Sequence, residues 1–165
     1  MQSKDLLLLA NQQCAMMTFP LLEDLASAPL ITGAGSDGNH AHWILGHLVV
    51  SEGGFRSMME GTPNPAESLK PLFGGGSRPQ PEGQDYPSYE ELLSQLKARH
   101  EETVAWIGTL SEDDLDQKSK SIPEGFESLF GTWRQVLLMR PLHWMNHRGQ
   151  LADCRHAAGR APLMA

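Results

Sequence analysis

Hydrophobic residues recur every three or four positions in four stretches of the chain, which is the spacing of an amphipathic α-helix. The first predicted helix begins after Ser3, an N-cap residue, and is ended or kinked at Pro20, because proline removes a helical hydrogen-bond donor. The second is predicted to begin near Ser36 or Asp37 and to end near Gly61.

Capping patterns mark the starts of the third and fourth predicted helices. Ser88 with Glu91, and Thr132 with Gln135, have the spacing of a capping box. The fourth helix contains Pro141, which is expected to kink it. No period-2 alternation of strand length is found in the sequence, so the pattern predicts an all-α fold, a four-helix bundle.

Glycines interrupt the second predicted helix at Gly46, Gly53 and Gly54. Each lowers the intrinsic helix propensity by ~1 kcal/mol, so packing must hold this helix together. We expect a neighbouring element to approach closely at Gly46.

A long connection separates the second and third predicted helices. Residues 61–87 contain six prolines, an apolar pair, Leu72 and Phe73, and a run of three glycines directly after it. Loops of this length are often lids or binding loops, although a surface excursion with the apolar pair tucked onto the bundle is an equal alternative. We expect the connection to cross the open end of the bundle and to form a wall of a pocket there.

Composition limits the classes of function. The 165 residues predict one domain, 1–165, and 40% hydrophobic content suits a globular core. The net charge of −7, without a basic stripe, argues against nucleic-acid binding. No apolar run is long enough for a membrane span and no signal-peptide pattern is present, so no membrane partner and a cytoplasmic location are expected. Cys14 and Cys154 are interpreted as small buried hydrophobic residues.

Three of the seven histidines have a placement that suits a metal ion. His143 and His147 are four residues apart, so they share one helix face. His47 falls on the apolar stripe of the second helix and points inward; it is either a hydrogen-bonded core histidine or a third ligand. Three imidazole ligands would leave a coordination position open, as in catalytic sites.

Three further histidines and one glutamate are considered for the site: His40, His100, His156 and Glu52. His40 lies too far along the helix axis to share that ion but could line the mouth of the pocket. His100 is either a pocket residue or a satisfied core histidine, and the second interpretation is favoured. Glu52 is five residues from His47, which turns it away from the ligand face, and it is interpreted as a surface residue. His156 lies near the C-terminal end of its helix.

Two motifs together resemble the DinB-like family of metal-binding four-helix bundles. They are the segments 42–48, HWILGHL, and 143–151, HWMNHRGQL. The resemblance assigns the family's metal-binding histidines to His47, His143 and His147, and it implies an up-down-down-up or related bundle topology. The 72–74 loop and the 85–88 segment before the third helix are also similar to the family.

The resemblance implies a metal-dependent hydrolase or a thiol S-transferase that acts on a small-molecule substrate. The cofactor would be a divalent ion such as zinc, nickel or iron, together with a low-molecular-weight thiol in the second case. No carboxylate is evident as a general base, which favours thiol or small-electrophile transfer over hydrolysis. The alternative is a non-enzymatic, stress-related metal-binding or ligand-binding bundle. Abundant Trp, Met and Phe residues also suggest a homodimer.

Overall fold

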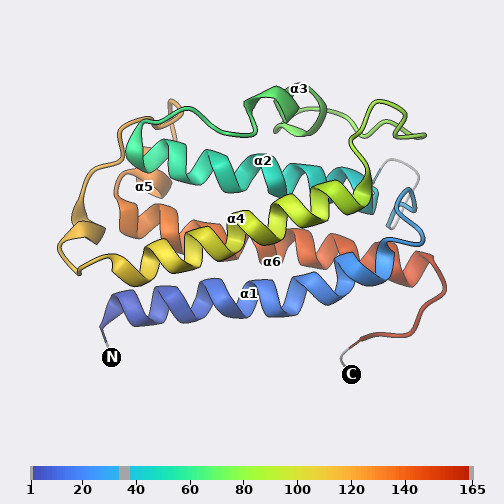
Figure 1. The fold of residues 1–165 in the computed structure, drawn as a ribbon, viewed down its shortest axis with the longest axis horizontal. Helices are drawn as coiled ribbons and strands as arrows, with labels where there is room; N and C mark the ends of the chain where they lie inside the picture. Colours follow the sequence, from blue (N-terminus) through green and yellow to red (C-terminus); the bar gives the residue numbers. More distant parts are fainter. Residues whose placement is uncertain (1, 34–37, 164–165) are drawn as a thin grey trace.

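The computed structural model describes residues 2–33 and 38–163, and four long α-helices form its body (Figure 1). They are α1 (Ser3–Leu25), α2 (Ala41–Glu60), α4 (Tyr89–Thr109) and α6 (Trp133–Ala157). The connections carry two short α-helices, α3 (Lys70–Phe73) and α5 (Glu127–Phe130), and two 3₁₀ turns, Glu67–Leu69 and Asp114–Asp116. Within the described ranges there is no β-strand, and none of the helices is long and apolar enough to cross a membrane.

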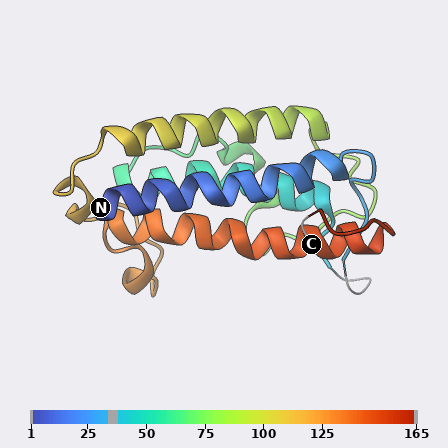
Figure 2. The ribbon, with the colours of Figure 1, turned by 90° about the horizontal axis from the view of Figure 1, so that it is seen from below.

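The four long helices follow the up-down-down-up order that the family resemblance implies. α1 and α6 run in one direction, and α2 and α4 run in the other (Figure 1). α4 and α6 each pack against both α1 and α2, which places α1 diagonally across from α2 (Figure 2). The prediction of an all-α four-helix bundle is therefore confirmed.

Three of the predicted helix ends, at Gly61, Ser88 and Thr132, agree with the structure. Gly61 ends α2 with a φ of 71°, in the left-handed region that favours glycine. The Ser88 hydroxyl accepts a hydrogen bond from the Glu91 amide, and Thr132 forms a complete capping box with Gln135.

Three details of the first two helices differ from the sequence analysis or lie outside it. Ser3 is already inside α1, and the N-cap is Gln2. α1 continues through Pro20 to Leu25, so the proline does not end it. The predicted start of α2 near Ser36 or Asp37 lies outside the described residues or at their edge; α2 is described from Ala41, with His40 as its N-cap.

The 61–87 connection has to travel the length of the bundle because α2 and α4 run in the same direction. It returns along the outer side of α2 rather than across the open end, and it contains α3 (Figure 1). The Phe73 side chain is fully buried against Gly46. A Cβ atom at position 46 would lie 2.4 Å from the phenyl ring, which confirms the close approach expected there.

A polar layer divides the core of the bundle into two apolar clusters. Each long helix contributes one residue to it: Asn11, Glu52, His100 and Arg140. Arg140 donates hydrogen bonds of 2.6 and 2.9 Å to Glu52, one of 2.9 Å to His100 Nδ1, and one to the side-chain oxygen Oδ1 of Asn11. Trp144 Nε1 donates to the other Glu52 oxygen at 2.6 Å. The layer therefore links all four long helices.

The interpretation of Glu52 as a surface residue is wrong. Its side chain points away from His47, as the spacing indicated, but it enters the core and is 3% exposed. A buried carboxylate requires a paired charge and hydrogen-bond donors, and Arg140 with Trp144 supplies both.

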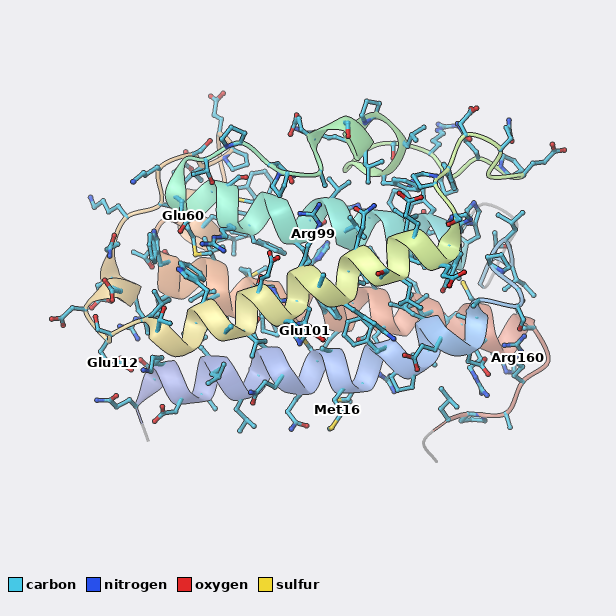
Figure 3. All side chains as sticks on the ribbon, viewed as in Figure 1. Met16, Glu60, Arg99, Glu101, Glu112 and Arg160 are labelled. Atoms are coloured by element: carbon cyan, nitrogen blue, oxygen red, sulfur yellow. The ribbon has the colours of Figure 1, made fainter. Side chains whose placement is uncertain are left out.

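Several large apolar side chains remain on the outside of α1 and α6, which pack against each other. On α1 these include Met16, which points away from the bundle (Figure 3). Exposed leucines accompany it on both helices: Leu6, Leu9, Leu138 and Leu142.

Candidate metal centre

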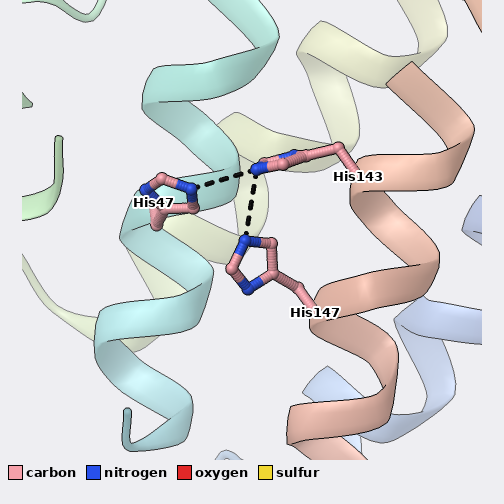
Figure 4. A group of neighbouring side chains, drawn as sticks. All are labelled: His47, His143 and His147. Carbon is pink, nitrogen blue, oxygen red and sulfur yellow. Dashed lines mark hydrogen bonds between the residues drawn. The ribbon is translucent and has the colours of Figure 1, made fainter. Parts of the chain in front are cut away.

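The bundle brings His47 of α2 together with His143 and His147 of α6 (Figure 4). His143 Nε2 lies 3.1 Å from His47 Nε2 and 3.2 Å from His147 Nε2. One ligand atom from each of the three residues lies within 4.8 Å of the other two. The two spacings that sequence analysis singled out, an i, i+4 pair and an inward histidine on a facing helix, thus meet at one point.

The arrangement of these nitrogens fits a single metal ion. Zinc binds imidazole nitrogen at ~2.0–2.1 Å, so ligands at tetrahedral angles are ~3.3 Å apart. The observed spacings of 3.1 and 3.2 Å are close to that value. The ligand atoms of the third pair, His47 and His147, are no more than 4.8 Å apart, so one ion can lie between all three histidines.

The backbone of the 61–87 connection orients the His47 ring. His47 Nδ1 donates a hydrogen bond of 2.7 Å to the Phe73 carbonyl oxygen, so the proton is on Nδ1 and the lone pair of Nε2 faces His143. The Trp43 indole stacks on the imidazole, with ring centroids 4.9 Å apart and planes 9° apart. Trp43 Nε1 in turn donates to the Leu72 carbonyl oxygen at 3.2 Å. The backbone carbonyl groups of Leu72 and Phe73 therefore hold the His47 ring in its orientation, Phe73 directly and Leu72 through Trp43.

Burial keeps the three imidazoles neutral. It lowers the pKa of His143 to about 3 and that of His147 to about 4, and it also lowers the pKa of His47. Repulsion between neighbouring imidazolium charges lowers the first two pKa values further. A metal ion binds the unprotonated ring, so this environment favours ligation over protonation at neutral pH.

A cleft of about 800 Å³ lies beside the histidines, and His47 and His143 are part of its wall. The 61–87 connection forms one side of the cleft with residues that include Thr62, Asn64, Lys70 and Gly74. The prediction that this connection forms a wall of the pocket is confirmed, although the segment runs alongside α2.

Another part of the cleft wall comes from a segment that sequence analysis missed. Residues 121–123, together with Phe126 and Phe130 around α5, face the cleft there. Phe130 lies 6.3 Å from Phe55 of α2, and Phe55 lies 5.6 Å from His143, measured between ring centroids. A clustered pair of phenylalanines in an otherwise polar segment was the only signal for this wall.

The other candidate residues lie outside the cleft lining found among the described residues. His40 caps α2 by accepting a hydrogen bond from the Trp43 amide, and its Nε2 pairs with the Gln80 carbonyl oxygen at 2.9 Å. Its expected place at the pocket mouth is therefore not what the structure shows. His100 accepts a hydrogen bond from Arg140, which agrees with the favoured interpretation of a satisfied core histidine.

Two comparisons with known proteins bear on the family to which the chain belongs. A search of curated proteins finds no match to the chain. The family model of the DinB superfamily matches residues 10–151, a range that includes all of α2 and α4, the larger part of α1 and α6, and all three histidines of the cluster. The chain belongs to the DinB superfamily.

Proposed function

We propose that the protein is a metal-dependent enzyme in which His47, His143 and His147 hold one divalent ion at the cleft. The observation that carries the proposal is the convergence of three neutral imidazole nitrogens beside a cleft large enough for a small molecule. Such an ion, when bound, lowers the pKa of a water or thiol ligand and makes it a better nucleophile.

The chain's own residues bind and orient the reactants. The phenylalanine wall and Val50 and Met58 of α2 give the cleft an apolar lining, which suits an uncharged part of a substrate. The Ser51 hydroxyl lies 3.5 Å from His47 Nε2, where it can donate a hydrogen bond to a group held at the histidines.

The distribution of carboxylates favours thiol S-transfer over hydrolysis. Hydrolysis needs a general base near the nucleophilic water. Glu52 is committed to Arg140, and the acidic residue found in the cleft wall, Glu67, is 61% exposed and paired with Lys70 at 3.2 Å. A thiol that loses its proton on metal binding needs no such base, so a low-molecular-weight thiol is the proposed co-substrate.

Elemental analysis of the purified protein tests the metal proposal. We expect close to one equivalent of a divalent metal, with zinc, nickel and iron as the candidates, and its loss in His47→Ala. His156→Ala is the matched control, because it removes an exposed imidazole from the end of α6. Equal metal content in the two variants would contradict the assignment of His47 as a metal ligand.

An activity screen tests the reaction. Metal-loaded protein is offered small esters and amides, and separately a thiol with a small electrophile. Turnover of the second set only, and its loss in His47→Ala, would support S-transfer. If no substrate is turned over and a chelator strongly lowers the melting temperature, the result would favour the alternative, a binding module with a structural metal.

We propose further that residues 1–165 act as one domain and that two copies pair through the outer faces of α1 and α6. The support is the set of exposed apolar side chains on these adjacent helices, which a monomer seldom leaves uncovered.

A further inference from the structure

A second pocket, of about 190 Å³, lies between the C-terminal halves of α1 and α6. Leu21 of α1 and Ala152 of α6 contribute apolar surface, and Arg148, Arg155 and Arg160 surround it. No residue that lines this pocket also lines the metal cleft. The pocket is therefore separate from the metal cleft.

The charge balance of this pocket opposes that of the whole chain. Its lining, within the described part of the chain, contains three arginines and His156 but no acidic side chain. Two of these arginines pair with the carboxylate of Asp24, which lies 3.0 Å from Arg155 and 2.6 Å from Arg160. Three guanidinium charges against one carboxylate leave two positive charges in a chain whose net charge is −7.

Two guanidinium nitrogens beside the pocket are buried and have no hydrogen-bond acceptor among the described residues. They are Arg148 Nε and Arg155 Nη1. The side chain of Arg155 is 11% exposed, so water reaches little of it. A buried donor on a charged group without an acceptor is costly, and an oxyanion is the acceptor that fits a guanidinium best.

We propose that this pocket binds a small oxyanion, a carboxylate or phosphate group, held by Arg148 and Arg155 with its apolar portion against Leu21 and Ala152. Arg160 completes the pocket by joining α1 to the end of α6: it donates to the Asp24 backbone and carboxylate oxygens and to the Ser27 hydroxyl. The site is independent of the proposed metal chemistry.

Isothermal titration calorimetry of the full chain tests the proposal, with inorganic phosphate and butyrate as separate probes at constant ionic strength in chloride. We expect saturable 1:1 binding of at least one probe, weakened about tenfold or more in Arg148→Gln. Arg78→Gln is the control, because it removes one exposed arginine charge from the 61–87 connection. The preferred probe distinguishes a carboxylate ligand from a phosphate ligand.

A second pair of variants keeps the test valid if Arg148→Gln unfolds the protein. Ala152→Glu places a carboxylate one helical turn from Arg148, where it occupies the site from within, so anion binding is lost and the fold is retained. Ala152→Gln adds similar bulk without charge and should retain more binding than Ala152→Glu. Absence of saturable binding, equal effects of Arg148→Gln and Arg78→Gln, or loss of binding in His47→Ala would each overturn the proposal; the last would place the anion at the metal cleft.

Discussion

Asn11 compensates for a hydrogen bond that Pro141 removes from α6. Proline has no amide hydrogen, so the Leu137 carbonyl oxygen, four residues earlier, has no helical donor. Asn11 Nδ2 donates to that oxygen at 3.2 Å, and Oδ1 of the same side chain accepts from Arg140. Because a guanidinium group only donates, this orientation of the amide is the one that satisfies both neighbours.

Asn11→Ala should therefore destabilise the protein by more than the loss of a small side chain. It leaves the Leu137 carbonyl oxygen and one Arg140 nitrogen buried without partners, at ~1–3 kcal/mol each. The sum, about 2–6 kcal/mol, is a large fraction of a typical unfolding free energy of ~5–15 kcal/mol. Urea unfolding measures the change, and Asn146→Ala, which alters an exposed asparagine of α6, should stay within ~0.5 kcal/mol.

A double-mutant cycle isolates the compensation. Pro141→Ala restores an amide hydrogen that can donate to the Leu137 carbonyl oxygen. In that background Asn11→Ala should cost less by about 1–3 kcal/mol, because only the Arg140 nitrogen loses its partner. An equal cost of Asn11→Ala in both backgrounds would refute the role assigned to Asn11.

Three further outcomes are expected. Gly46→Ala should displace Phe73, whose carbonyl oxygen orients His47, and a chelator competition should then show metal affinity weakened about 10–100-fold. The control Gly54→Ala, where an added Cβ has no contact closer than 3.7 Å, should bind the metal normally. The pKa of His100 is lowered to about 4, by burial first and then by the adjacent guanidinium charge, so this residue makes stability fall as pH drops from ~6.5 toward 4; the melting temperature of His100→Gln should fall less steeply over that range. Leu142→Glu places a charge on the exposed face of α6, and light scattering should then show an 18.2 kDa monomer where the parent chain shows a dimer; a parent chain that is monomeric would refute the pairing.

The sequence predicted the parts of the fold and site that local spacing controls. Helix ends at Gly61, Ser88 and Thr132 follow from capping chemistry, which needs only neighbouring residues. Two members of the metal cluster could be predicted because the spacing of His143 and His147 alone places them on one helix face. His47 needed one more step, the inference that its apolar stripe faces the core.

The polar layer was missed because Glu52 was judged by its spacing from His47 and not by its place on the core stripe of its own helix. Glu52 falls on a core stripe of α2 whose members recur at three- and four-residue spacing: Leu45, Leu48, Glu52, Phe55 and Met59. Arg140 occupies the equivalent position on α6, between Leu137 and Trp144. A charged residue on such a stripe is the signal of a buried pair, but one helix alone does not reveal its partner. The 121–130 wall has no periodicity, and its place depends on how the long helices pack.

The polar layer and the metal cluster are neighbours on α6, so the hydrogen bonds of the layer affect the axial position of the metal ligands relative to α2. Trp144 lies between the two α6 ligands in sequence, and its indole is fixed to Glu52 at 2.6 Å, while Arg140 is fixed to the same carboxylate from the preceding turn. Directional hydrogen bonds of this kind are satisfied at one axial offset of α6 against α2, and a shift by one turn, ~5.4 Å, would break all of them. An apolar interface permits more sliding, because leucines pack adequately in several registers. A buried ion pair contributes little net stability, so we infer that its value here is to fix the register in which His47 meets His143 and His147.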